Sequence, residues 1–364
     1  MRPFRSLALC LLLLAPSMYC LAQEAPSLPI SDAQRKAVIE TLGQKLNDNY
    51  VFPDVAAKVS ADISAKAASG GYDADKDTNS FARALTKDLR GMAKDLHFEV
   101  GYQPTFKEGP HGDQPPSKED LDQMKSDAAR MAFGIAKVQR LPGNVGYLDI
   151  RGFLPADFSA SGYASAMNLL SGTDALILDL RQNGGGDPGA VATLLSYFFA
   201  EGDDRHLNDL YWRPENRTQE FWTIPVPGPR YLKPVYVLTS AVTFSGGEEC
   251  AYDFQTQKRG TLIGEKTGGG ANPGDAFSLG HGFAIFIPTG RAINPITKTN
   301  WEHVGVKPDV AVPAEDAFKT AYVTILKMQI AKTKDHDELN ALKEVLARAE
   351  KGEEEPPRFK LPTP

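Results

Sequence analysis

The sequence predicts an α/β fold in which helices cover a sheet, and this sheet domain follows a helical N-terminal segment. The main observation is the sequence pattern after residue 132, where short apolar runs alternate with helical segments. The expected strands are residues 143–150, 175–180, 235–238 and 261–263. The expected helices between them include residues 158–170 and 188–199. Alternation of this kind is typical of a layered α/β domain. A hairpin is also expected over residues 283–293, with Thr289 and Gly290 as its turn.

Helical spacing of apolar residues predicts three helices between residues 31 and 91, separated by turns that contain Pro and Gly. Ser31 is a plausible N-cap for the first of them. These helices predict a small N-terminal helical bundle. Two further helices are expected near the C-terminus, over residues 314–328 and 337–349.

Residues 1–22 have the pattern of a secretory signal peptide. Arg2 and Arg5 precede an apolar run at residues 7–14, and Ala22 is a small residue suited to cleavage. The run is too short to span a bilayer, although an uncleaved anchor is the alternative. We therefore expect an exported protein, periplasmic or secreted, with no membrane span after signal cleavage. Only Cys250 would remain, so no internal disulfide is expected.

The composition limits the possible partners. The chain has 364 residues, 42% of them hydrophobic, which is enough for a core that needs no metal or disulfide. Its formal charge of −6 and the lack of a basic stretch argue against nucleic acid as a partner. Its six histidines are scattered, so the sequence predicts no metal site and no cofactor.

The most informative segment is VYVLTSAVTFSGGEE at residues 235–249. It predicts a buried strand, a short connector, and Ser245 at the start of a helix. A hydroxyl at such a turn lies beside unpaired backbone N–H groups that can hold a developing negative charge, as acyl transfer requires. The alternative is an ordinary N-cap serine.

Three other segments carry candidate site residues. DLRQNGGG at residues 179–186 follows an apolar run, so its glycine amides should lie at the carboxyl end of a strand. They could form an oxyanion hole or cradle substrate backbone, whereas the lysine of a phosphate-binding loop is missing. A flexible turn is the alternative.

His97, in DLHFEVGY, is a candidate general base, although a lone histidine is more often structural. In WEHVGVKPDV, Glu302 could orient a histidine, His303 is a rival base, and both could equally be solvated loop residues.

Taken in order, the motifs DLRQNGGG, TFSGGE, GEKTGGG and WEHVGVKPD resemble those of the C-terminal processing protease superfamily. That group includes the tail-specific proteases, the tricorn protease core and the interphotoreceptor retinoid-binding proteins. The resemblance covers residues 143–312 and extends to about Ser31 through DLHFEV. It implies a crotonase-like ββα core and a serine endopeptidase activity with Ser245 as nucleophile.

The chain departs from the tail-specific branch, whose base is a lysine. Gly270 stands at that lysine position, and Lys266, four residues earlier, is an alternative base. The peptide-binding insert of that branch is also missing. The resemblance to the tricorn branch instead implies that His97 is the base and Glu302 its partner. It further implies an oxyanion hole made by the Gly246 amide and one amide of the 184–186 glycines, of which Gly185 and Gly186 are the candidates.

We therefore predict an exported serine-type endopeptidase that acts on peptide or protein substrates through an acyl-enzyme. The alternatives are a non-catalytic retinoid- or fatty-acid-binding protein on the same scaffold and, by fold analogy only, an enoyl-hydratase-like acyl enzyme. The predicted divisions are a signal peptide (1–22), an N-terminal helical domain (23–102), a linker (103–132), a serine peptidase core (133–312), C-terminal helices (313–350) and a disordered tail (351–364).

Overall fold

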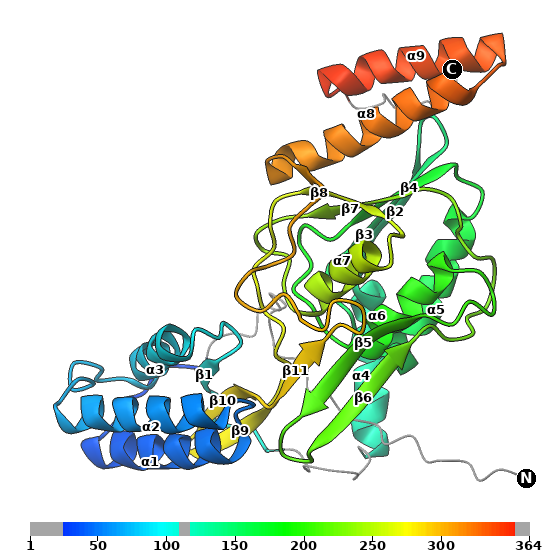
Figure 1. Ribbon diagram of the computed structural model, residues 1–364. Coiled ribbons are helices and arrows are strands. Elements are labelled where there is room, and N and C mark those ends of the chain that lie inside the picture. Colours follow the sequence, from blue (N-terminus) through cyan, green and yellow to red (C-terminus); the bar gives the residue numbers. More distant parts are fainter. Residues whose placement is uncertain (1–24, 109–116, 354–364) are drawn as a thin grey trace, which may run out of the picture.

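The computed structural model describes residues 25–108 and 117–353. Figure 1 shows an N-terminal lobe, a larger core lobe, and a pair of helices packed on the far side of the core. The predicted signal peptide and most of the predicted disordered tail lie outside the described residues. Within those residues, no helix is both long and apolar enough to cross a bilayer.

The N-terminal lobe contains the three expected helices, α1 (Asp32–Asn49), α2 (Pro53–Ala68) and α3 (Thr78–Ala93). Ser31 caps α1, because its hydroxyl accepts a hydrogen bond from the Gln34 amide. The helices do not form a bundle by themselves. They share a hydrophobic core with a three-stranded antiparallel sheet in the order β1 (Glu99–Tyr102), β10 (Phe283–Pro288) and β9 (Gly274–Gly280). Two of its three strands thus come from late in the chain.

The prediction of a hairpin over residues 283–293 is wrong, because its two strands do not pair with each other. β10 pairs with β9 and β1, whereas β11 (Gly290–Ile293) pairs with β5 (His206–Trp212) in a separate three-stranded sheet. β6 (Arg217–Trp222) completes that sheet. The chain therefore changes sheets at Thr289, and it passes from the N-terminal lobe back to the core at that point (Figure 1).

The core lobe is built on a six-stranded sheet in which only the β2–β3 pair is antiparallel. Its order is β12 (Val310–Ala311), β8 (Thr261–Gly264), β7 (Val235–Thr239), β4 (Ala175–Asp179), β3 (Val145–Ile150) and β2 (Ile135–Leu141). Every residue of β3 and β4 is buried. Strands covered on both faces are continuously apolar, which is why these runs were visible in the sequence.

Helices cover both faces of this sheet. One face packs against α5 (Ala156–Leu170), α6 (Pro188–Leu195) and α7 (Gly246–Thr256), and the other against α8 (Ala314–Lys332) and α9 (His336–Lys351). The short 3₁₀ turns η1 (Ala132–Gly134) and η2 (Ser196–Phe198) lie in the connections. α4 (Lys118–Arg130) occupies part of the predicted linker.

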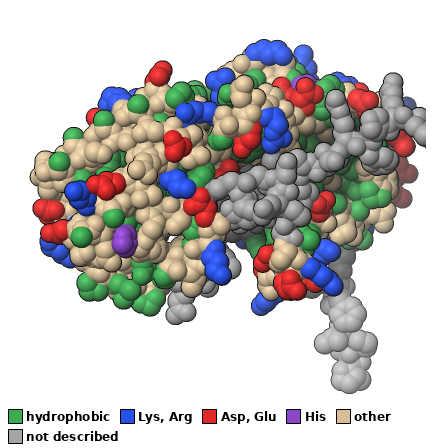
Figure 2. All heavy atoms as spheres, turned by 90° about the horizontal axis from the view of Figure 1, so that it is seen from below, with side chains coloured by type: hydrophobic (Ala, Val, Ile, Leu, Met, Phe, Trp, Pro, Cys, Tyr) green, Lys and Arg blue, Asp and Glu red, His purple; other side chains and the backbone are tan. Residues whose placement is uncertain are grey.

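Hydrogen bonds join the two lobes. The guanidinium of Arg213, just after β5, donates to the carbonyl oxygens of Tyr50 (2.7 Å) and Asn47 (2.9 Å) at the end of α1. Within the N-terminal lobe, the Val51 amide donates to the Pro288 carbonyl oxygen at the end of β10 (2.9 Å), next to the point where the chain crosses to the core. Figure 2 shows basic and acidic side chains interspersed over one face of the molecule, so the described residues there present no extended region of one charge.

Candidate active site

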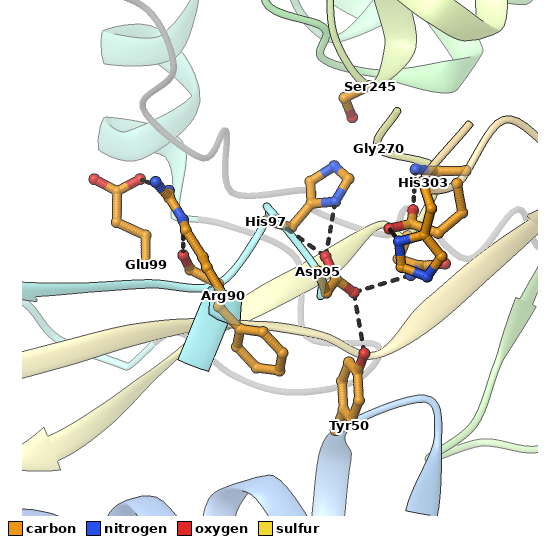
Figure 3. Close-up of polar contacts among 12 residues, drawn as sticks. Tyr50, Arg90, Asp95, His97, Glu99, Ser245, Gly270 and His303 are labelled. Atoms are coloured by element: carbon orange, nitrogen blue, oxygen red, sulfur yellow. Dashed lines mark hydrogen bonds and ion pairs between the residues drawn. The ribbon is translucent and has the colours of Figure 1, made fainter. Parts of the chain in front are cut away.

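Ser245 lies in the turn between β7 and α7, at the edge of the sheet where the carboxyl ends of the parallel strands meet. Its backbone has φ 52° and ψ −123°, a conformation that residues other than glycine rarely adopt. Such outliers concentrate at functional sites, where surrounding contacts must hold them in place. Figure 3 shows the Ser245 side chain directed toward the ring of His97.

Glu248 holds this turn in place. Its fully buried carboxylate accepts hydrogen bonds from the amides of Ser245 (3.0 Å), Gly269 (2.7 Å) and Gly270 (2.8 Å), and from the Thr267 hydroxyl. Burial raises the pKa of Glu248, while these four donors act in the opposite direction. From sequence, Glu248 is only one of two acidic residues in the first turn of the expected helix, where the helix dipole favours them. The S-x-x-E spacing of a capping box was the available signal for its larger role.

His97 follows α3 and is held by Asp95, two residues earlier. Asp95 Oδ1 lies 3.3 Å from His97 Nδ1 and accepts the His97 amide at 3.0 Å. A ring that donates from Nδ1 to a carboxylate presents Nε2 as an acceptor. Nε2 is buried without a hydrogen-bond partner among the described residues, and Figure 3 shows it on the side of the ring that faces Ser245. The hydroxyl and the ring do not hydrogen-bond in this structure; such contacts often tighten only when substrate binds.

Asp95 is a site residue that the sequence analysis missed. Its buried carboxylate also accepts the side-chain amide of Asn272 (2.9 Å). It accepts the hydroxyl of Tyr50 as well (3.3 Å), as Figure 3 shows. Burial alone would raise the pKa of Asp95, but the hydrogen bonds and charge of His97 and the Asn272 amide hold it below its usual value. The D-x-H spacing in DLHF was the only signal for this pair.

Glu302 was expected to support His97, but the carboxylate on the His97 ring belongs to Asp95. Glu302 instead accepts the Ala271 amide and lies 3.4 Å from His303 Nδ1. Burial, followed by the negative charge of Asp95, raises the pKa of Glu302 to about 8. The His303 side chain is 53% exposed and takes no part in the contacts that surround Ser245.

The glycine loop after β4 distinguishes between Gly185 and Gly186, the two candidates for the second oxyanion donor beside Gly246. The Gly185 amide donates to Asn183 Oδ1 (2.8 Å), whereas those of Gly186 and Gly246 bond to no other described residue. The two backbones are adjacent, since a Cβ on Gly246 would lie 3.1 Å from the Gly186 nitrogen. Gly186 has φ 133°, and a Cβ there would lie 2.0 Å from the Phe153 carbonyl oxygen, so only glycine fits.

The lysine position of the tail-specific branch has no space for a side chain here. A Cβ on Gly270 would lie 2.2 Å from the Phe244 ring and 2.7 Å from His97 Cε1. The His97 and Phe244 rings pack together, with centroids 4.6 Å apart, and occupy that volume. Lys266 is exposed and makes none of the contacts that bring Ser245 and His97 together.

Substituting Gly270 tests this packing. We expect Gly270→Ala to displace the His97 ring from Ser245, and to lower stability by about 1–3 kcal/mol, the usual cost of overpacking. Thermal unfolding and labelling of Ser245 by a fluorophosphonate would measure the two effects. Gly91→Ala is the matched control, because a Cβ there meets no atom within 4 Å. Wild-type labelling of Gly270→Ala would contradict the inferred crowding.

Two family models match successive segments of this chain. The model described as Peptidase family S41 matches residues 144–312, and the N-terminal domain of Peptidase_S41 in eukaryotic IRBP matches residues 23–133. A carboxyl-terminal-processing protease of Synechocystis sp. (strain ATCC 27184 / PCC 6803 / Kazusa) is 29% identical over 177 residues, which are 47% of this chain and 39% of that protein. The chain therefore spans about two fifths of that relative's length.

Two solved structures share the fold. Mature CPAF complexed with lactacystin has a TM-score of 0.53 at 12% identity, with 88% of this chain and 100% of that chain covered. The tricorn protease has a TM-score of 0.51 at 13% identity, with 88% of this chain but only 37% of that chain covered. At these identities the likeness is one of architecture.

Proposed function

The chain carries both domains of peptidase family S41 and belongs to that family, and from this premise we propose that it is a serine-type endopeptidase with Asp95, His97 and Ser245 as its catalytic set. The observation that carries the proposal is the His97 imidazole. Asp95 contacts its Nδ1, and its unpartnered Nε2 lies on the side of Ser245. A nucleophile, a base and a group that orients the base are the constellation that acyl transfer requires.

In the proposed reaction, His97 Nε2 accepts the Ser245 proton while Oγ attacks the carbonyl carbon of a peptide bond. The Asp95 carboxylate stabilises the imidazolium that forms. His97 then donates its proton to the leaving amine. Water, deprotonated by the same ring, hydrolyses the ester on Ser245 and restores the free enzyme.

The negative charge on the tetrahedral intermediate would be held by the amides of Gly186 and Gly246, which no other described group occupies. Each donor of this kind typically contributes about 3–4 kcal/mol to transition-state stabilisation. Glu302 would not contact the His97 ring; it would support the site indirectly, by holding the loop that carries Ala271. The substrates would be peptides or proteins, and the pattern of residues 1–22 supports an exported, periplasmic or secreted location. The family match does not favour the ligand-binding alternative.

The choice of base is the sharpest test of this proposal. We expect His97→Ala to lower kcat/KM by roughly 10⁴-fold or more, because the serine loses its proton acceptor. Lys266→Ala should remain close to wild type, since that side chain is exposed and forms no described hydrogen bond with Ser245 or His97. Hydrolysis of fluorescent casein and fluorophosphonate labelling of the full chain provide the measurements. The reverse ranking of the two variants would make lysine the base, and a wild-type chain that neither cleaves nor labels would refute the peptidase assignment.

A further inference from the structure

We propose that Tyr50, at the end of the first helix, is a positioning residue that tunes the basicity of His97 through Asp95. This inference rests on the proposed function for its catalytic meaning, although the coupling it describes can be measured without any activity. Tyr50 caps the C-terminus of α1, and its hydroxyl bonds to Asp95 while its ring packs on Phe52 and Phe98. Figure 3 shows it on the opposite side of Asp95 from His97.

The two oxygens of Asp95 have separate sets of donors. Oδ1 accepts the His97 amide at 3.0 Å and lies 3.3 Å from the His97 ring nitrogen. Oδ2 accepts the Tyr50 hydroxyl at 3.3 Å and the Asn272 side-chain amide at 2.9 Å. The carboxylate therefore cannot rotate without breaking contacts on both sides, and the His97 ring is held at the angle that presents Nε2.

Tyr50 is suited to act as a permanent donor. Its side chain is only 2% exposed, and its ring packs against Phe98 (centroids 4.8 Å apart) and Phe52 (5.6 Å). Burial, and then the charge of Asp95, raise the pKa of Tyr50 well above its ordinary value, so the phenol keeps its proton. A protonated phenol whose only described acceptor is a carboxylate can serve only as a donor there.

The hydrogen bond from Tyr50 should favour the neutral form of His97. A donor interacts more strongly with a full negative charge than with one that an adjacent imidazolium already neutralises. Tyr50 thus stabilises the state in which His97 is unprotonated and able to act as a base. Among the described residues, Glu302 is a further titratable group near Asp95, and Glu248 in turn lies near Glu302. The rings that face His97, Phe244 and Phe286, are uncharged.

Both lobes fix the position of Tyr50. Arg213 of the core donates to its carbonyl oxygen at 2.7 Å, and the next residue, Val51, donates to the Pro288 carbonyl oxygen at 2.9 Å. The hydroxyl that supports the catalytic carboxylate therefore lies at a junction where the N-terminal helices meet the core.

The test compares Tyr50→Phe with Tyr72→Phe. Tyr72 is a matched control in the same lobe, since it is equally buried and its hydroxyl donates to Asp88 at 2.6 Å, away from His97. We expect Tyr50→Phe to move the acid limb of the kcat/KM profile to higher pH by roughly half a unit to one unit, which is about a three- to tenfold loss of activity below the limb. Tyr72→Phe should leave the limb in place.

A second measurement does not depend on activity. The ring resonances of His97, assigned by comparison with His97→Gln, should titrate with a higher midpoint in Tyr50→Phe than in wild type or Tyr72→Phe. Asn272→Ala removes the other donor to the same oxygen and should shift the midpoint in the same direction. An unchanged midpoint in Tyr50→Phe would overturn the inference, as would a uniform loss of activity at all pH values that matches a loss of folding stability. A shifted midpoint in a chain without peptidase activity would support the positioning role and refute only the proposed function.

Discussion

Ser245→Ala is expected to lower peptide hydrolysis by a factor on the order of 10⁶ while the protein remains folded. The loss would be this large because the proposed reaction passes through an ester on Oγ. The other two hydroxyls of that turn, on Ser240 and Thr243, donate to the carbonyl oxygens of Arg181 and Leu180. The fold should persist because the Ser245 amide, rather than its hydroxyl, holds the turn through Glu248. Alanine meets the same backbone penalty at φ 52° as serine does.

The measurement is kcat/KM on a fluorescent protein substrate, together with a thermal unfolding curve for each variant. Ser165→Ala is a suitable control, because that serine lies on an exposed turn of α5 and bonds only to the Ser161 carbonyl oxygen. Residual hydrolysis by Ser245→Ala above one part in a thousand of wild type would point to another nucleophile. Equal fluorophosphonate labelling of wild type and Ser245→Ala would also point to another nucleophile.

Glu248→Ala is expected to lower both stability and activity. The substitution leaves three backbone amides and one hydroxyl without their acceptor in a site that water does not reach. Loss of a buried charged acceptor usually costs about 3–5 kcal/mol. Because one carboxylate holds both the Ser245 turn and the Gly269–Gly270 backbone beside His97, its removal should also release the nucleophile from its strained conformation. Urea unfolding and casein hydrolysis measure the two effects.

Two variants sharpen this second result. Glu248→Gln keeps the side-chain shape but turns an NH₂ group toward amides that also donate, so it should lose activity although its volume is unchanged. Glu344→Ala removes an exposed glutamate from α9 and should leave both quantities near wild type. If Glu248→Gln were as active and stable as wild type, the carboxylate would not be what holds the turn.

The sequence predicted those parts of the fold that depend on local pattern. Buried parallel strands such as β3 and β4 are continuously apolar, and the N-terminal helices carry apolar residues at helical spacing. The partners of β10 could not be predicted, because its register with β1 joins residues about 180 positions apart, and its alternation fits a local hairpin equally well. Pairing of that kind is decided by tertiary packing.

The site shows the same division. Ser245, His97 and the glycine loop lie in motifs that the sequence displays. The carboxylate that serves His97 could not be chosen from sequence, since Asp95 and Glu302 are both acidic and only the fold determines which one contacts the ring. The same is true of Gly185 and Gly186, because only the fold shows that the Gly185 amide already donates to Asn183.

The proposed nucleophile and its base lie in different halves of the polypeptide, in segments matched by different family domains. Under the proposed mechanism, a nascent or clipped chain with only one half intact carries a hydroxyl without an acceptor for its proton, or an imidazole with nothing to activate. Under the proposed mechanism, hydrolysis would therefore require the whole chain to be folded, since β9 and β10 from late in the sequence also complete the lobe that carries His97.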